Sequence, residues 1–197
     1  MPQHRIDDLP DFVNIPLETL ACGDRQMSDA DARERVSAAL HEAVHLLAAI
    51  TRRASVRRVE VSPTGRPKRG ATGRVYAAER LPCDGAFIAY VGHAWEELHG
   101  DVALAAGDLR DGHRFADEAK KPRDELLSEA REFVLLGDGA FEVVAAAILA
   151  VMPKSGILEG RKLQRVIDTF RDVMHGAPSH ASEHRSPPRR SKMAPAL

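Results

Sequence analysis

Residues 29–51 constrain the fold more than any other part of the sequence, because they contain neither glycine nor proline and are rich in good helix formers. Ser28 stands just before this run as a candidate N-cap, and Asp31 follows three residues later. Apolar side chains recur at the spacing of one helix face: Val36, Leu40, Val44 and Leu47. The pattern predicts one long helix against which the rest of the chain must pack.

A β-hairpin is predicted directly after this helix. The segment SVRRVEVSP, residues 55–63, is rich in valine, and RVYAAE, residues 74–79, also has the composition of a strand. Between them, TGRPKRGATG over residues 64–73 combines glycine, proline and basic residues in the manner of a loop. The two strands are therefore expected to pair with each other.

The remainder of the chain favours helices separated by short breaks. LPCDG is expected to interrupt the chain before a helix over 86–100, and a helical stretch over 109–121 is expected to break at Gly112 and to end at Pro122. Two apolar stretches around GDG predict a helical pair or one bent helix, and a last helix is expected over 157–174. The predicted fold class is mainly α (α+β), a helical domain with a small β-hairpin.

The chain length of 197 residues suits one domain with tails. We expect a loosely packed N-terminal arm over 1–27 with one short helix, followed by a folded domain over 28–175. From residue 176 to residue 197, Pro, Ser, His, Arg and Lys dominate, which predicts a disordered tail.

Composition excludes several classes of function. The formal net charge of −1 lacks the basic excess of a nucleic-acid-binding protein. The longest apolar stretch, FEVVAAAILAVM, carries a glutamate and is too short to span a bilayer, and the first residues lack the apolar core of a secretory signal. The two cysteines form no CxxC motif, which indicates a reducing compartment. We therefore expect a cytoplasmic protein with no nucleic-acid partner and no membrane.

The segment HEAVH places two histidines four residues apart around a glutamate, inside the predicted long helix. Residues at i and i+4 lie one turn apart on the same helix face, so His41 and His45 can direct ring nitrogens to one point. Neutral imidazole is a common zinc ligand, and Glu42 can act as a general base. The pattern is typical of zinc hydrolases, and an ordinary helix that carries two imidazoles is the alternative.

A catalytic zinc needs a third protein ligand, which this motif does not name. The extended pattern HExxHxxGxxH is absent, because Ala48 and Thr51 occupy the positions of its glycine and its last histidine. Spacing leaves the third ligand open among several downstream candidates: His93, Glu96, Glu97, His99, Asp101, Asp108, Asp111 and His113.

Five segments, taken in order, resemble the peptidase domain of FtsH-type zinc proteases. HEAVH is similar to that family's HEAGH helix, and SVRRVEVSPTGRPKRGATGRVY is similar to its valine-rich hairpin. GHAWEELHG resembles a helix of pattern G-R-x-A-E-E, AAGDLRDGHRFA resembles GAxND-L-x-x-A-T, and ILEGRKLQRVI resembles the end helix TLxGxEIxxIL. The resemblance extends over roughly residues 30–170 and implies a zinc-dependent peptidase.

Particular roles follow from the resemblance. His41 and His45 would be zinc ligands, Glu42 the catalytic base, and Asp108 the third zinc ligand. Glu96 matches a family glutamate near the site, where it would support a ligand histidine.

Two positions depart from the family pattern. Val44 replaces a glycine within the motif, and Gly107 replaces an asparagine before Asp108. The stretch between the glutamate helix and Asp108 is also shorter than in the family, so His113 or Asp111 is the alternative third ligand.

The sequence contains no GxxxxGK[ST] pattern and therefore no P-loop. We expect a zinc-dependent endopeptidase, a hydrolase that acts on unfolded or short polypeptides without its own ATPase or that receives them from a separate ATPase or adaptor. The alternative is a non-catalytic zinc-binding, peptidase-like module that binds a protein partner. The oligomeric state is left open.

The predicted hairpin offers a way to bind such a polypeptide. An extended peptide can pair with an exposed strand edge through main-chain hydrogen bonds. The edge at 55–61 or at 74–78 could serve in this way, and the basic loop residues Arg66, Lys68 and Arg69 could contact acidic residues of a substrate or partner.

Overall fold

The computed structural model describes the chain in five segments: residues 15–22, 27–61, 73–78, 81–99 and 106–175. Several expectations concern residues outside these segments: the tail over 176–197, most of the loop over 64–73 with its basic residues, and the candidate ligand Asp101.

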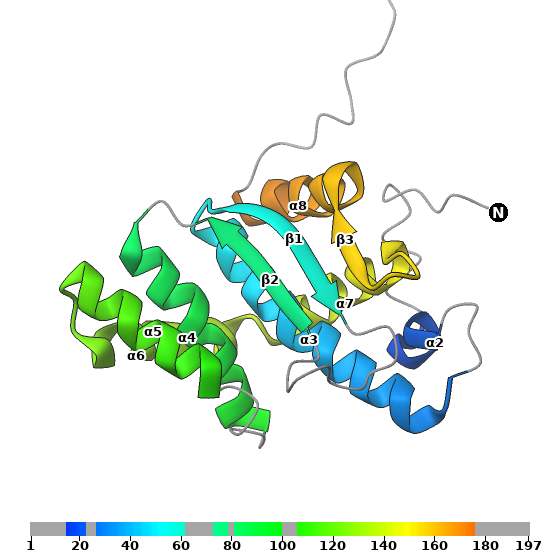
Figure 1. Ribbon diagram of the computed structural model, residues 1–197, viewed down its shortest axis with the longest axis horizontal. Helices are drawn as coiled ribbons and strands as arrows, with labels where there is room; N and C mark the ends of the chain where they lie inside the picture. The colour runs from blue at the N-terminus through cyan, green and yellow to red at the C-terminus, as the bar shows by residue number, and fades with distance from the viewer. Residues whose placement is uncertain (1–14, 23–26, 62–72, 79–80, 100–105, 176–197) are drawn as a thin grey trace, which may run out of the picture.

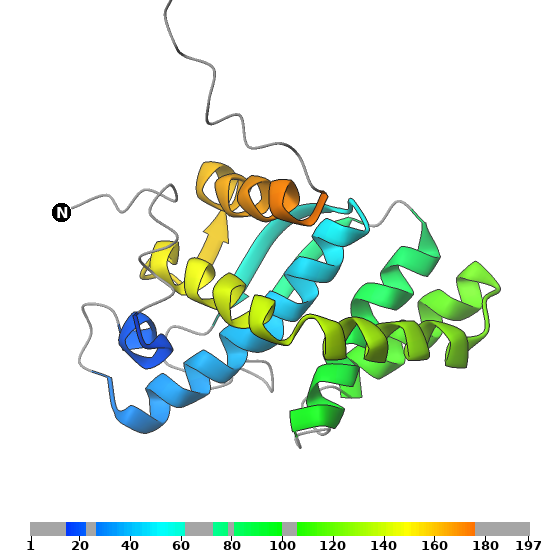
Figure 2. The same ribbon diagram turned by 180° about the vertical axis from the view of Figure 1, so that it is seen from behind.

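Helix α3 (Asp29–Thr51) lies at the centre of the fold, with the sheet on one side and α7 (Asp138–Val151) on the other (Figures 1 and 2). It begins where predicted, since the Ser28 hydroxyl accepts a hydrogen bond from the Asp31 backbone N–H at 3.1 Å. The short helix expected in the N-terminal arm is α2 (Leu17–Cys22), which packs near the beginning of α3.

The predicted hairpin is confirmed as β1 (Ser55–Val61) paired with β2 (Gly73–Ala78) in an antiparallel arrangement. A third strand, β3 (Ile157–Glu159), pairs with the other side of β1, so the prediction of helix from residue 157 is wrong. The positive φ angles of Gly156 and Gly160 bracket this short strand and prevent the helix from starting earlier. The sheet order is β2-β1-β3, so β1 is the central strand, and the expectation of an edge at 55–61 is also wrong.

Helix α4 (Pro82–His99) starts earlier than predicted, because LPCDG does not interrupt the chain. Pro82 occupies the first helical position, where a missing backbone N–H costs nothing. The N–H groups of Asp84 and Gly85 bond to the Leu81 carbonyl and close the first turn.

Helix α5 (Ala106–Ala119) runs through Gly112 without the predicted break. A Cβ atom at Gly112 would lie 2.5 Å from the Tyr90 ring, so this glycine allows α5 to pack closely against α4. The helix ends before Pro122, as predicted, with Lys120 in the left-handed region at φ 55°.

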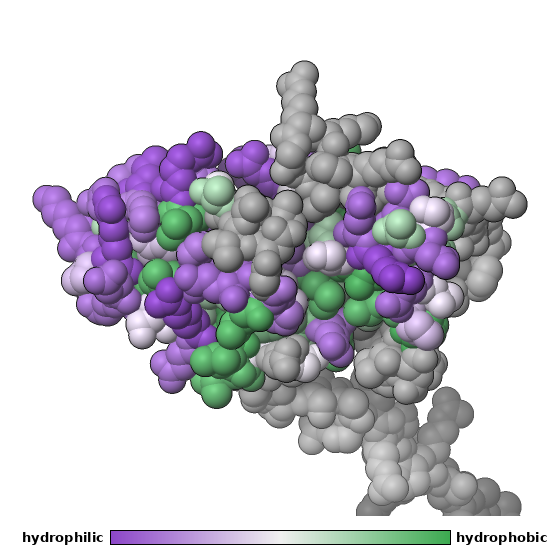
Figure 3. Space-filling model, turned by 90° about the horizontal axis from the view of Figure 1, so that it is seen from below, coloured by the Kyte–Doolittle hydropathy of each residue, from purple (hydrophilic) through white to green (hydrophobic). Residues whose placement is uncertain are grey.

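Helix α6 (Arg123–Leu136) and α7 follow as two separate helices around Gly137. Within the described segments no single helix is long and apolar enough to cross a membrane, and the bent pair of α6 and residues 139–151, at 79°, meets that test only when the two are taken together. On the face drawn in Figure 3, hydrophobic residues form separate patches among hydrophilic ones.

Helix α8 (Gly160–His175) closes the fold against α3, α7 and the sheet. The core is mainly aliphatic, as the low aromatic content predicts, and α3 contributes Ala43, Leu46, Leu47 and Val44 to it. Val44 is completely buried, so the branched side chain inside the HEAVH segment fills the core. The prediction of a mainly α fold with a small antiparallel sheet is confirmed.

Candidate metal centre

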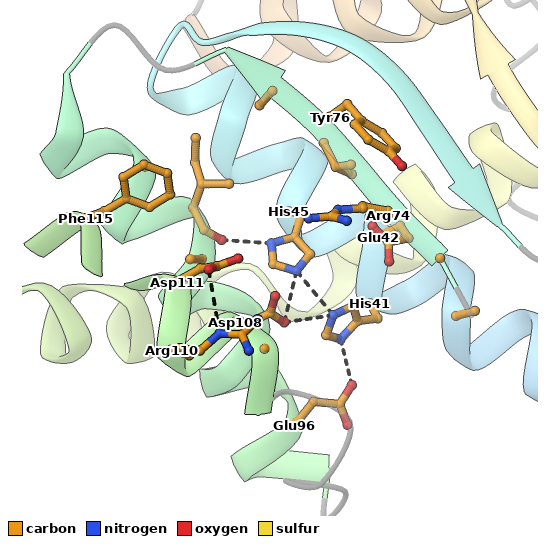
Figure 4. Close-up of a pocket in the computed structure, with 18 of the residues that line it drawn as sticks. His41, Glu42, His45, Arg74, Tyr76, Glu96, Asp108, Arg110, Asp111 and Phe115 are labelled. Carbon is orange, nitrogen blue, oxygen red and sulfur yellow. Dashed lines mark hydrogen bonds and ion pairs between the residues drawn. The ribbon is translucent and has the colours of Figure 1, made fainter. Parts of the chain in front are cut away.

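Two histidines on one face of α3 are held in fixed orientations by neighbouring elements. The Nδ1–H of His41 donates to Oε1 of Glu96 on α4 at 2.7 Å, and the Nδ1–H of His45 donates to the Ile88 carbonyl oxygen at 2.8 Å. Because both Nδ1 atoms face acceptors, each ring can direct an Nε2 lone pair away from them. The two Nε2 atoms lie 3.2 Å apart (Figure 4).

Asp108, in the first turn of α5, completes this cluster. Its Oδ2 atom lies 3.2 Å from Nε2 of His41 and 3.3 Å from Nε2 of His45. Three atoms that all accept hydrogen bonds therefore converge on one point, an arrangement that only a proton or a cation can stabilise. Among the described residues, His41, His45 and Asp108 form a group that can hold a metal ion.

A glycine on α4 makes room for this cluster. A Cβ atom at Gly92 would lie 2.4 Å from the His45 ring and 2.6 Å from Oδ2 of Asp108, far inside van der Waals contact. By contrast, a Cβ at Gly107, directly before Asp108, would have no neighbour within 4 Å. Only one of the two glycines is therefore required by the geometry of the centre.

Glu42 lies next to the cluster and is almost completely buried, at 2% exposure. Its Oε2 atom has no hydrogen-bond partner among the described residues, although a buried carboxylate oxygen normally has one. Gly73 at the start of β2 packs against it, since a Cβ there would lie 2.6 Å from Cγ of Glu42. The carboxylate is thus confined at the wall of the cleft that also contains the two histidines.

The electrostatics of the cluster follow from burial and close charges. Burial lowers the pKa of His41, but hydrogen bonds to Asp108 and Glu96 outweigh this effect and raise it to about 10. Burial raises the pKa of Asp108, and the charge of His45 with the hydrogen bonds of both histidines holds it well below its usual range. Burial raises the pKa of Glu42 to about 7, against the charges of His41 and His45. Cation binding would replace the proton that His41 and Asp108 share.

The cleft around the cluster has a volume of about 890 Å³ and lies between α3, α4, α5 and β2. Residues 73–78 of β2 line it, and the other side of this strand has no partner strand among the described residues. Of the two strand edges expected from the sequence, only the edge at 74–78 is therefore available beside the cluster.

The remaining candidate ligands lie elsewhere or have other partners. His93 contacts Glu97, whose carboxylate is bound by Arg131, and the His99 ring stacks on Trp95 at 3.8 Å. The two alternatives to Asp108 are also outside the group: the His113 ring packs edge-on against Tyr90, and Asp111 faces Arg110 and Arg114.

Sequence reasoning missed two residues of the site. Gly92 and Gly73 lack side chains that could signal a role, and spacing alone did not place either beside HEAVH. The weak signal was that Gly92 precedes Glu96 by one helical turn, on the face expected to approach the ligand helix.

Comparisons with known proteins add no family to this description. No protein-family model matches the chain, and searches of curated proteins and of solved structures find no match either.

Proposed function

We propose that this chain is a zinc-dependent endopeptidase that acts on unfolded or short polypeptides. The observation that carries the proposal is the convergence of His41, His45 and Asp108, with ligand atoms 3.2–3.3 Å apart. Two ligands at about 2.0–2.1 Å from a tetrahedral zinc ion are ~3.3–3.4 Å apart. The triangle of ligand atoms therefore has the size of one face of a zinc coordination tetrahedron.

The chemistry of the ligands also favours zinc. Two imidazole nitrogens and one carboxylate oxygen form a set typical of catalytic zinc, with the fourth position left open. Calcium and magnesium prefer sites built from oxygen atoms alone. When bound, zinc supplies Lewis acidity both to a peptide carbonyl and to the attacking water.

The residues of the chain would divide the remaining work. Glu42 would take a proton from the attacking water as the new C–O bond forms, and would return it to the leaving amine as the C–N bond breaks. Burial raises the pKa of this carboxylate, and a raised pKa favours a group that accepts and then releases a proton. Glu96 would orient the ring of His41 and increase the basicity of its Nε2 atom.

The edge of β2 would hold the substrate. An extended polypeptide can add to this edge as a fourth strand, through main-chain hydrogen bonds that do not depend on sequence. Such binding requires an unfolded segment, which matches the proposed class of substrate. The resemblance to FtsH-type peptidases supports the same assignment of residues, and a separate ATPase or adaptor would then deliver folded substrates.

Glu42 also favours an enzyme over a non-catalytic zinc module. A purely structural site would have no use for a buried carboxylate oxygen without a partner, which costs about 1–3 kcal/mol or more. A water molecule at the metal would satisfy this oxygen.

The experiment compares the untagged protein with Glu42→Gln and with a matched control, Glu132→Gln, an exposed residue on α6. Metal analysis should give one zinc per chain in all three proteins. An unfolded casein-like substrate should be cut by the wild type and by the control, whereas the rate of Glu42→Gln should fall at least about 100-fold. Stoichiometric zinc with no cleavage by the wild type would contradict the peptidase proposal.

A second experiment tests the edge of β2 without changing the protein. A strand bound to this edge points every second amide towards β2. Peptides N-methylated at alternate amides should therefore divide into one series that is cut and one that is not. Equal cleavage of both series would contradict binding by strand addition.

A further inference from the structure

Four arginines surround the cleft that contains the metal group. They come from both of its walls: Arg57 from β1, Arg74 from β2, and Arg110 and Arg114 from α5. Four carboxylates also line the cleft, those of Glu42, Glu96, Asp108 and Asp111, so the charge that a ligand meets depends on how these carboxylates are engaged.

Three of these carboxylates lie in or beside the metal group. Glu96 is bonded to His41, Asp108 belongs to the metal group, and Glu42 is buried beside it. Glu96 and Asp108 are therefore committed to the centre, whereas Glu42 also interacts electrostatically with Arg74.

Asp111 is the remaining acidic residue among the described residues of the cleft. It lies 4.0 Å from Nε of Arg110 and 3.8 Å from Nη2 of Arg114, at the limit of an ion pair. Arg114 also lies 3.4 Å from Glu118, which is outside the cleft. One carboxylate is thus shared by two guanidinium groups on α5, and the side chain of Arg110 is 81% exposed.

The two arginines that the sheet contributes lie on the other wall of the cleft. Within the described part of the chain, Arg57 and Arg74 have no carboxylate at ion-pair distance, and both side chains are exposed. Arg74 lies on the strand edge proposed to bind the substrate, and Figure 4 shows it on the same side as Glu42 and His45, across the site from Arg110. A polypeptide along β2 would therefore pass between guanidinium groups of the two walls.

We infer that the cleft selects acidic polypeptide segments, with Asp or Glu side chains near the scissile bond paired to Arg74 on one wall and to Arg110 and Arg114 on the other. This inference rests on the proposed function, for which it names the substrate class. Guanidinium groups bind carboxylates in bidentate geometry, and exposed guanidinium groups attract ligands of the opposite charge. The bound zinc would add further positive charge.

The test uses internally quenched peptides of one length that differ only in the residues flanking the cleaved bond: Glu, Gln or Lys. At low salt, kcat/KM of the zinc-loaded wild type should be about tenfold higher for the Glu peptide than for the Gln peptide, and lowest for the Lys peptide. The preference should fall in 0.5 M salt, where exposed charges are screened. Each peptide is made with a free and with an amidated C-terminus, which separates side-chain from terminal carboxylate recognition.

Variants assign the preference to the arginines. Arg74→Gln and the double change Arg110→Gln with Arg114→Gln should each reduce the Glu-over-Gln ratio by about two- to fivefold, because exposed charge pairs contribute little individually. Arg161→Gln, an exposed arginine on α8 outside the cleft, should leave the ratio unchanged. Zinc content confirms that each variant is folded at its centre.

The outcomes separate this inference from the proposed function. Equal rates for the three peptides, or a preference unchanged in both arginine variants, would overturn the inference while the peptidase assignment stands. Rates that depend on the free C-terminus and not on the flanking residue would overturn it in favour of terminal carboxylate binding. Acidic peptides that bind in fluorescence anisotropy but are never cut would support the acidic preference and contradict the peptidase assignment.

Discussion

Glu96 and Glu97 are neighbours on α4, yet they belong to different parts of the molecule. Glu96 is buried and accepts a hydrogen bond from Nδ1 of His41 in the metal group. Glu97 lies at the surface, where it accepts hydrogen bonds from Nε and Nη2 of Arg131 at 2.8 and 2.9 Å and contacts His93 at 3.3 Å.

The difference arises from helix geometry and from the partner of each carboxylate. Successive residues point about 100° apart around a helix, so Glu96 faces α3 while Glu97 faces α6. The guanidinium of Arg131 neutralises Glu97 and joins two helices. The imidazole of His41 instead places the charge of Glu96 behind a ligand atom, where it increases the affinity for a cation. The pairing of His93 with Glu97 therefore contributes to helix packing, whereas the pairing of His41 with Glu96 orients a residue of the metal group.

The largest predicted effect comes from comparing a histidine of the metal group with the histidine beside Glu97. His45→Ala removes a ligand atom, so zinc binding should fall from one equivalent to almost none, measured by metal analysis after dialysis against a weak chelator. His93→Ala, also buried, should retain one equivalent despite some loss of stability. Loss of zinc in His93→Ala but not in His45→Ala would reverse the assignment.

A glycine pair tests the space around the centre. In Gly92→Ala the added Cβ would overlap the His45 ring and Oδ2 of Asp108, so zinc affinity should fall by at least about 100-fold, the upper range for loss of ligand support. Gly107→Ala adds a methyl group in open space within α5, and should retain zinc while stabilising the helix by about 0.5–1 kcal/mol. Competition with a chromogenic chelator measures the affinities, and equal values for the two variants would contradict the packing described.

Substitution of Glu96 or Glu97 should change zinc affinity less than substitution of Gly92. Glu96→Gln should weaken zinc binding about 10- to 100-fold, because a neutral amide supports the His41 ring less well than a carboxylate. Glu97→Gln should leave zinc affinity within about twofold of the wild type, since its partner is Arg131. The same chelator competition measures both, and matching losses would show that the two carboxylates are equivalent.

The smallest predicted effect is on stability and depends on pH. The hydrogen bond from Arg131 holds the pKa of Glu97 below its usual value. A depressed pKa contributes stability above the pKa of the unfolded chain, about 4.3, and this contribution is lost as the pH falls through the lower folded value. Glu97→Gln should therefore cost at most about 1 kcal/mol at pH 7, for an ion pair near the surface.

Urea unfolding of both proteins at pH 7 and pH 3.5 measures this difference. It should shrink at the lower pH, because the wild type loses the ion pair that the variant never had. A difference that grows on acidification would show that another group is responsible.

The sequence contained enough information for α3 and for the ligand pair upon it. An N-cap, a long run without glycine or proline and the i, i+4 spacing of two histidines are local signals, and helices depend mainly on such signals. The hairpin was also predictable, because its two strands have strand-like composition and follow each other in the chain.

The features that the sequence did not predict depend on contacts between distant segments of the chain. Residues 157–159 form a strand because β1 offers a free edge, and only Gly160, at positive φ, marks the change from this strand to α8. Gly112 was read as a break, yet its role is set by the Tyr90 ring of another helix. Residue spacing does not distinguish among the candidate third ligands, and only the family resemblance indicates Asp108. Its position in the first turn of α5, across the cleft from α3, is a property of the tertiary fold.

The central claim is that His41, His45 and Asp108 together bind one divalent ion. A crystal structure of the zinc-loaded protein, with anomalous data collected above and below the zinc edge, tests it most directly. The account predicts one strong anomalous peak about 2.0–2.2 Å from Nε2 of both histidines and from a carboxylate oxygen of Asp108. A peak at any other group of residues, or no peak in protein that has been saturated with zinc, would contradict it.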